Sequence, residues 1–182
     1  LDLLRTFIAH HRLTSPGDRV GAAVSGGADS VCIFRLLFEH RNEIGFAFPV
    51  VYFDHQLRPE SANEAHFVAE LAAAFDCPFH LGGADVRAYA LLHRQSIETA
   101  ARNLRYAFFD SLLSRGRPPA SAGGYDDAAL AAGANSLHKI ATAHTQTDQA
   151  ETVMMKLLRG AGPRGLSGIH PLYQRTHSAG VI

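Results

Sequence analysis

The sequence predicts an α/β fold, a doubly wound parallel sheet with helices on both faces. Two observations favour it. Short apolar runs alternate along the chain with stretches whose apolar residues recur at helical spacing, and this alternation is typical of parallel β–α–β units. The chain of 182 residues, 47% of them hydrophobic and 19% charged, also has the size and composition of one globular domain with a sizeable core.

The elements can be placed in order along the chain. Strands are expected over residues 19–24, 47–53, 78–82 and 139–143. Helices are expected from residue 3 to the Ser-Pro-Gly turn at 15–17, and over 28–40, 59–75, 96–113 and 147–158. The fourth of these begins at Ser96, a good N-cap residue. On the last helix, an apolar side that includes Met154, Leu157 and Leu158 is expected to pack against the rest of the protein.

One stretch, residues 116–136, does not fit this pattern. It is rich in Pro, Gly, Ala and Ser and has no clear apolar period. We expect a surface insertion or a mobile loop there.

Composition excludes several classes of protein. Lys plus Arg balances Asp plus Glu, so the net charge of zero does not indicate a strong polyanion binder. Cys32 and Cys77 lie far apart without a C-x-x-C pair, which argues against a disulfide framework, a zinc knuckle or an iron–sulfur site. No apolar stretch reaches the roughly 18 residues of a membrane span, and no signal peptide is visible. A cytoplasmic protein without membrane contact is expected. Because the chain begins at Leu1 rather than Met, a fragment of a longer protein is also expected.

The stretch SGGADS, from Ser25 to Ser30, follows an apolar run directly. Gly26 and Gly27 permit unusual backbone angles and a close approach of amide groups to a ligand, and the helix that follows supplies free N–H groups at its N-terminus. A phosphate group is therefore the expected ligand, and a plain strand-to-helix turn is the alternative. Asp29 inside such a cradle would repel phosphate unless a cation bridged the two, which implies Mg²⁺.

Two further segments are expected beside this loop. In open parallel sheets, ligands bind at the carboxyl ends of the strands. This rule places residues 25–30, 54–58 and 144–149 on one rim of the sheet.

Four more motifs follow the loop in order: DHQLRPES from Asp54, ETAARNLRY from Glu98, AHTQTDQAET from Ala143 and RGAGPRGLSGI from Arg159. Each has a plain structural explanation. Polar side chains at a strand end can satisfy loop amides, arginines can form a solvated helix face, an acidic residue can stabilise a helix N-terminus, and a glycine run can be a flexible exit. Their joint occurrence in this order is harder to explain in that way.

The motifs carry a resemblance to a known family. The strand–SGGxDS–helix arrangement looks like the PP-loop of the ATP-pyrophosphatases. With the other motifs, the stretch from Val20 to Ile169 resembles the N-terminal catalytic domain of the tRNA(Ile)-lysidine synthetases. The resemblance implies one catalytic domain over residues 1–182, with the family's C-terminal tRNA-binding domains absent. Thr147 departs from the family pattern, in which many members have a second acidic residue beside Asp148, and the 116–136 insertion is longer than usual.

The resemblance implies an activity. It is that of an ATP-dependent ligase, which adenylates the wobble cytidine of an isoleucine tRNA and lets the amine of L-lysine displace AMP to form lysidine. ATP and Mg²⁺ are the implied cofactors, and the tRNA and L-lysine are the implied partners. The oligomeric state stays open, a homodimer being one alternative.

The same resemblance, with the chemistry above, gives a set of site residues. Catalytic roles are expected for Asp29, Arg102, Arg105 and Asp148, with Asp29 and Asp148 as metal ligands. Nucleotide contacts are expected from Ser25, Gly26, Gly27, Ala28, Asp29, Ser30, Asp54, His55 and His144. Two alternatives remain: another PP-loop enzyme, such as a tRNA thiolase or an amidotransferase synthetase domain, and an ATP-binding module without turnover. The missing C-x-x-C pair counts against the first.

Overall fold

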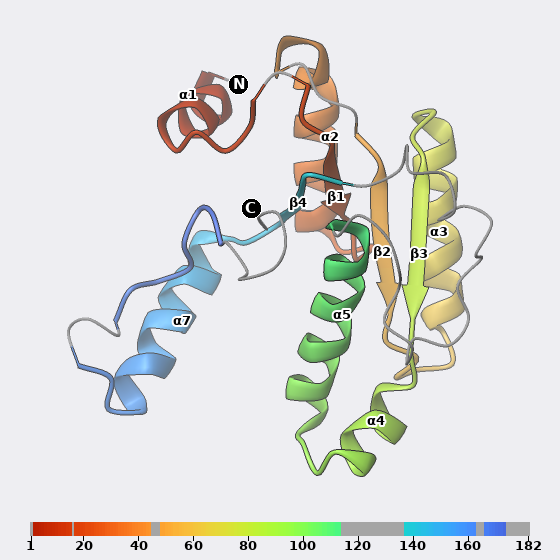
Figure 1. The fold of residues 1–182 in the computed structure, drawn as a ribbon, viewed down its shortest axis with the longest axis vertical. Coiled ribbons are helices and arrows are strands. Elements are labelled where there is room, and N and C mark those ends of the chain that lie inside the picture. The colour runs from red at the N-terminus through yellow and green to blue at the C-terminus, as the bar shows by residue number, and fades with distance from the viewer. Residues whose placement is uncertain (1, 16, 45–47, 114–136, 163–165, 174–182) are drawn as a thin grey trace.

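The core of the protein is one four-stranded parallel sheet (Figure 1). The computed structural model describes residues 2–15, 17–44, 48–113, 137–162 and 166–173, and the structural statements below concern these residues. The strand order is β3-β2-β1-β4. The strands are β1 (Val20–Ala23), β2 (Val50–Asp54), β3 (Phe79–Gly83) and β4 (Lys139–Thr142). The expected doubly wound α/β fold is confirmed.

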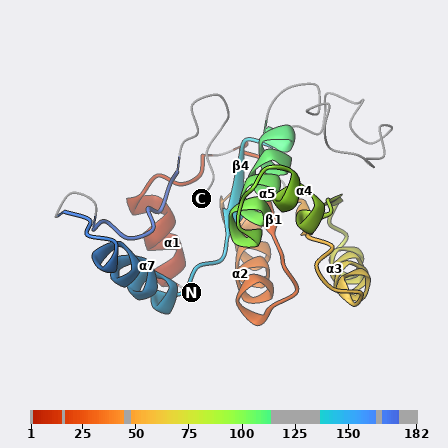
Figure 2. The same ribbon diagram turned by 90° about the horizontal axis from the view of Figure 1, so that it is seen from below.

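Helices cover both faces of the sheet (Figures 1 and 2). The described helices are α1 (Asp2–His10), α2 (Ala28–Ile44), α3 (Ser61–Ala74), α4 (Val86–Leu92), α5 (Ile97–Leu113) and α7 (Gln146–Leu158). Because side chains alternate along a strand, Val50 and Tyr52 of β2 pack in the cluster with α2 and α3, whereas Val51 and Phe53 pack in the cluster with α5. The two apolar faces of β2 thus build two separate cores.

The predicted elements agree with the observed ones, with differences at the ends. Each strand begins and ends within three residues of its expected bounds. The first helix ends earlier than expected, at His10, because Arg12 takes a positive φ of 50° and the Leu13 amide donates to the Ile8 carbonyl. This is a common helix C-cap, and it buries Leu13 in the core.

Helix α4 was not expected from the sequence. Its N-cap is Asp85, whose carboxylate accepts a hydrogen bond of 2.9 Å from the amide of Ala88. Val86 and Ala90 are buried against α5. The short helix therefore depends on a cap and on two small contacts rather than on a long apolar pattern.

The prediction for the apolar side of α7 is wrong for the part of the chain that the structure describes. No residue of this helix is buried, and Met154 and Leu158 are 61% and 79% exposed. Figure 1 shows α7 standing apart from the sheet. The N-terminus of α7 is therefore held by polar contacts rather than by packing.

Two other expectations concern the insertion and the membrane. The proposed insertion at 116–136 lies outside the described residues. Of the helices that the structure describes, none is long and apolar enough to cross a membrane.

Candidate functional site

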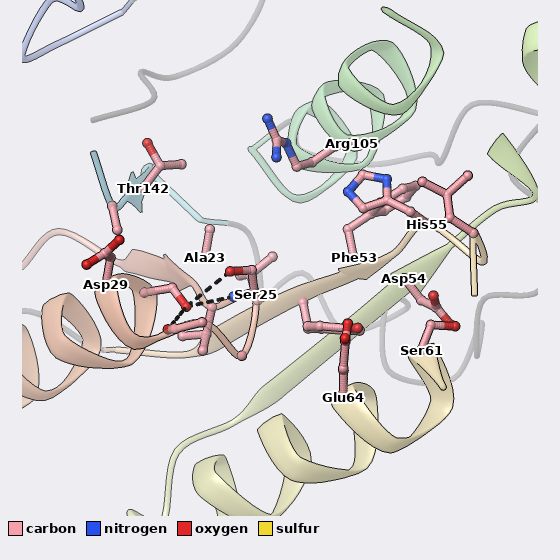
Figure 3. Close-up of a pocket in the computed structure, with 18 of the residues that line it drawn as sticks. Ala23, Ser25, Asp29, Phe53, Asp54, His55, Ser61, Glu64, Arg105 and Thr142 are labelled. Carbon is pink, nitrogen blue, oxygen red and sulfur yellow. Dashed lines mark hydrogen bonds between the residues drawn. The ribbon is translucent and has the colours of Figure 1, made fainter. Parts of the chain in front are cut away.

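The carboxyl ends of β1, β2 and β4 open into a cavity of about 860 Å³, here called the main cavity. Its walls are the loop after β1, the segment after β2, and faces of α3 and α5 (Figure 3). The volume is in the range of cavities that hold cofactor-sized ligands. The rim that the sequence predicted is therefore the location of a real cavity.

The loop after β1 is held in shape by one hydroxyl group. Ser30 is 6% exposed and donates to the Gly27 carbonyl at 2.8 Å. Its oxygen also lies 3.1 Å from the Ser25 amide and 3.2 Å from the Ser25 hydroxyl, both of which donate to it. Gly26 has a φ of 85°, a conformation that favours glycine. The backbone of the loop suits the expected phosphate cradle, but the Ser30 hydroxyl is already used in hydrogen bonds within the loop.

The two carboxylates expected to bind a metal lie in different surroundings. Asp29 is exposed in the first turn of α2 and lines the main cavity on the side where β4 ends at Thr142 (Figure 3). Asp148 does not line it. Its carboxylate accepts hydrogen bonds from the amide and the hydroxyl of Thr145, at 2.6 and 2.9 Å, and these bonds lower its pKa. Within the described ranges, no group of three or more His, Cys, Asp or Glu residues could hold a metal ion.

A positively charged wall faces the cavity from α5. Arg105 points from this helix toward the cavity (Figure 3). Burial lowers the pKa of its guanidinium, and the charge of Arg102 lowers it further. Both guanidinium groups lie over the ring of Tyr106, at 5.0 Å for Arg102 and 5.7 Å for Arg105. Neither forms an ion pair with a described carboxylate. A half-buried cation without a counter-charge indicates that an anion is the missing partner.

Two histidines complete the polar lining. Burial lowers the pKa of both His55 and His144, and the nearby charge of Arg105 contributes in each case. The Nδ1 atom of His55 is buried and has no hydrogen-bond partner, although its ring packs edge-on against Phe53. The Nδ1 atom of His144 lies 3.3 Å from the hydroxyl of Thr142. Both shifts favour the neutral imidazole.

The opposite wall belongs to α3 and was not predicted. Ser61, Glu64 and Phe67 of this helix line the main cavity, and Figure 3 shows Glu64 rising from α3. Glu64 pairs with Arg58 at 2.8 Å. Phe67 is 46% exposed, and its ring lies about 4.0 Å from where a side chain on Gly26 would begin. The three-residue spacing along one helix face is the signal that the sequence offered for this wall.

A second cavity of about 380 Å³ lies on the other side of the end of β4. It is mostly apolar, with walls from α1, α2, the first turn of α7 and residues 169–171. Four residues line both cavities and form a partition between them. They are Asp29, Thr142, Ala143 and His144.

Most of the predicted site residues come together. Those that line the main cavity are Ser25, Gly26, Gly27, Asp29, Ser30, Asp54, His55, Arg102, Arg105 and His144. Ala28 and Asp148 do not line it. The carboxylate of Asp54 accepts a hydrogen bond of 2.8 Å from the Gln56 amide, which shapes the turn after β2.

Comparisons with known proteins place this site in context. A family model described as a PP-loop domain matches residues 4–182. The tRNA(Ile)-lysidine synthase of Geobacter sulfurreducens is 40% identical over 173 residues, which are 94% of this chain and 32% of that protein. The tRNA(Ile)-lysidine synthase of Dehalococcoides mccartyi is 39% identical over 171 residues, 93% of this chain and 32% of that one. The chain thus spans about a third of the length of these curated relatives.

A solved structure has the same fold. It is the U34-tRNA thiolase NcsA from Methanococcus maripaludis with its [4Fe-4S] cluster, which matches with a TM-score of 0.63 over 86% of this chain and 49% of that one. The sequence identity is 13%, so the likeness concerns the fold alone.

Proposed function

This chain belongs to the family of PP-loop domains, and from that membership we propose that it is the ATP-binding catalytic domain of a tRNA(Ile)-lysidine synthase. One geometric observation carries the catalytic part of the proposal. The glycine loop after β1 and the unneutralised arginines of α5 face one cavity from different sides. The two similar proteins named as lysidine synthases support the choice of tRNA and lysine as substrates.

The reaction has two steps. An oxygen of the wobble cytidine bonds to the α-phosphorus of ATP while the bond to pyrophosphate breaks. The amine of L-lysine then forms a carbon–nitrogen bond to the base while AMP leaves. The amides of Gly26 and Gly27 and the N-terminus of α2 bind phosphate oxygens, and Arg102 and Arg105 stabilise the charge that develops on the departing pyrophosphate.

The attacking amine must lose a proton in the second step. His55 and His144 both have lowered pKa values, which favours the neutral imidazole, the form that can accept a proton. Both rings line the main cavity. Either ring therefore suits the role of base.

The residues present fit Mg²⁺ through Asp29. This ion usually keeps several waters and takes one or two carboxylates together with substrate phosphates, and Asp29 is an exposed carboxylate beside the phosphate-binding loop. The hydrogen bonds from Thr145 go to one oxygen of the Asp148 carboxylate, Oδ2, and Asp148 does not line the main cavity, so Asp29 is the better placed carboxylate. Bound there, the ion would neutralise phosphate charge and orient the leaving group.

A thiolase activity is less well supported. An iron–sulfur cluster such as the one in the U34-tRNA thiolase NcsA is usually held by several cysteine thiolates. In this sequence Cys32 lies on α2, at the second cavity, and Cys77 lies before β3. Neither lines the main cavity.

The test is an assay of pyrophosphate release by the full-length protein. ATP, isoleucine tRNA and lysine are supplied together, and each is then omitted in turn. We expect release to require ATP and the tRNA, and mass spectrometry of the tRNA to find a cytidine that carries lysine only when lysine is present. Release without tRNA, or a sulfur-containing nucleoside as the product, would contradict the proposal.

A further inference from the structure

The 166–173 segment is tied to α7 at two points. The side-chain amide of Gln149 donates to the Ile169 carbonyl at 2.7 Å, and its oxygen accepts from the Ile169 amide at 2.5 Å. The ammonium of Lys156 donates to the Ser167 carbonyl. Gln149 and Lys156 are seven residues apart and so lie on one face of the helix. The segment therefore runs back along α7 toward the helix N-terminus.

Gly168 fits this attachment closely. A Cβ atom at this position would overlap the side-chain oxygen of Gln149 and lie 3.0 Å from its Cδ. Only a residue without a side chain leaves room for the paired hydrogen bonds between Gln149 and Ile169. Gly168, one glycine of the motif that follows α7, is thus required by the close approach of the Gln149 side chain.

The attachment lies next to the candidate active site. Gln149, Ile169 and His170 line the second cavity, whose partition from the main cavity includes Asp29 and His144. Gln149 is in the first turn of α7, one residue after the capping box and five residues after His144. Whatever holds Gln149 therefore also limits where His144 can move.

Packing gives α7 little support of its own. No residue of α7 is buried, so its first turn is held by directed polar contacts: the capping box of Thr145 with Asp148, and the pair of bonds from Gln149. The capping box lies within the turn itself, so it does not tie the turn to another part of the chain. The Gln149 bonds join the turn to a part of the chain that is distant in sequence.

We propose that Gln149 is a positioning residue, which anchors the first turn of α7 to Ile169 and thereby holds His144 in place at the wall of the main cavity. The proposal rests on the proposed function, because it assigns His144 to the reaction in that cavity. The glycine loop lies on other elements, so binding of ATP does not depend on this anchor.

The test compares variants of the full-length protein in steady-state formation of lysine-carrying tRNA with ATP, tRNA and lysine all present, because His144 is proposed to act in the lysine-dependent second step. Gln149→Leu should lower kcat at least tenfold and leave the KM for ATP within twofold of the wild-type value. Gln146→Leu is the matched control, since it makes the same change on an exposed residue of the same helix that lines neither cavity. It should match the wild type.

A double-mutant cycle tests the contact itself. Gly168→Ala should lower kcat in the wild-type protein and add less than a twofold effect in Gln149→Ala, where the clashing side chain is gone. Additive effects, or a wild-type kcat for Gln149→Leu, would overturn the proposal. A rise in the KM for ATP that matches the fall in kcat would show a general structural role instead and would also overturn it.

Failure of the proposed function has a different signature. In that case the wild-type protein itself shows no tRNA-dependent release. The anchor is then judged by amide hydrogen exchange, which should be slow at Ile169 in the wild type and at least tenfold faster in Gln149→Leu. Equal exchange in the two proteins would overturn the anchor independently of activity.

Discussion

Arg105 lies close enough to His55 to lower the pKa of its imidazole. The two side chains come from α5 and from the segment after β2, and both line the main cavity. Burial is the larger cause of the shift, and the charge of Asp54 opposes it. The arginine wall thus acts on the protonation of the site even before an anionic ligand enters.

Removing that charge should move the imidazole in a defined direction. In Arg105→Gln, the pKa of His55 should rise toward its ordinary value of 6.5 without reaching it, because burial remains. An NMR titration of the His55 ring measures this. Arg35→Gln, on the exposed side of α2 and paired with Glu39, is the control and should leave the titration unchanged. An unchanged pKa of His55 in Arg105→Gln would show that the two groups are not coupled.

Asp29 is expected to be needed for turnover but not for folding. Asp29→Asn should lower the rate of pyrophosphate release at least a hundredfold, because an amide binds Mg²⁺ poorly beside phosphates. Its thermal unfolding should match the wild type, since the side chain is exposed. Asp76→Asn makes the same change at an exposed turn after α3, and should keep full activity. Wild-type turnover by Asp29→Asn would remove the metal assignment.

Acid should destabilise the fold through three histidines. Burial lowers the pKa of His55, His80 and His144 below 6.5. The unfolded chain therefore binds more protons than the folded one as pH falls below 6.5. The contribution of these neutral histidines to the free energy of unfolding is complete above pH 6.5, and it is lost as the pH falls from 6.5 through their lowered pKa values. Urea unfolding at pH 7.5 and 5.5 should give the lower free energy at pH 5.5, and His80→Gln should reduce the difference. A stability that rises toward pH 5.5 would contradict the assignment.

Gly82 of β3 is expected to resist substitution for a packing reason. A Cβ atom there would lie 2.7 Å from two ring carbons of Phe108, which is buried in the core beneath α5. Gly82→Ala should therefore lower the free energy of unfolding by about 1–3 kcal/mol. Gly162→Ala is the control, because nothing lies within 4 Å of its added atom. If chemical denaturation finds the two variants equally stable, the close contact at Phe108 is not a constraint.

The 182 residues alone are expected to bind nucleotide well and tRNA weakly. The chain has no net charge, and among its basic side chains Lys156 already donates to the Ser167 carbonyl. Neutralising few backbone phosphates gives dissociation constants of roughly 10⁻⁴–10⁻⁶ M that rise steeply with salt. Parallel titrations with ATP·Mg²⁺ and with isoleucine tRNA at several salt concentrations measure this. Tight, species-selective tRNA binding would locate the recognition surface within this chain.

The strands, the glycine loop and the rim were predictable because each depends on local chemistry. Buried parallel strands need short apolar runs, and Gly26 follows one of them directly. The gathering of Asp54 and His144 on one rim then follows from strand direction alone. The wall formed by Phe67 was not predicted, because it depends on how far α3 is rotated over the sheet.

One wrong prediction and one missed contact have clear physical reasons. The apolar spacing of Met154 and Leu158 predicts an amphipathic helix but does not say which surface covers its apolar side. Among the described residues, no surface buries these side chains. Thr145 and Asp148 have the three-residue spacing of a capping box. That signature was visible in the sequence, and it identifies a structural task for Asp148 beside the metal role.

The hydroxyl of Ser30 has a consequence for binding kinetics. Because it joins Ser25 to Gly27 through hydrogen bonds within the protein, the glycine loop is preorganised, and little conformational entropy remains to be lost when phosphate arrives. Association of the nucleotide then needs no slow rearrangement of this loop, so differences in affinity between nucleotides should arise in their dissociation rates.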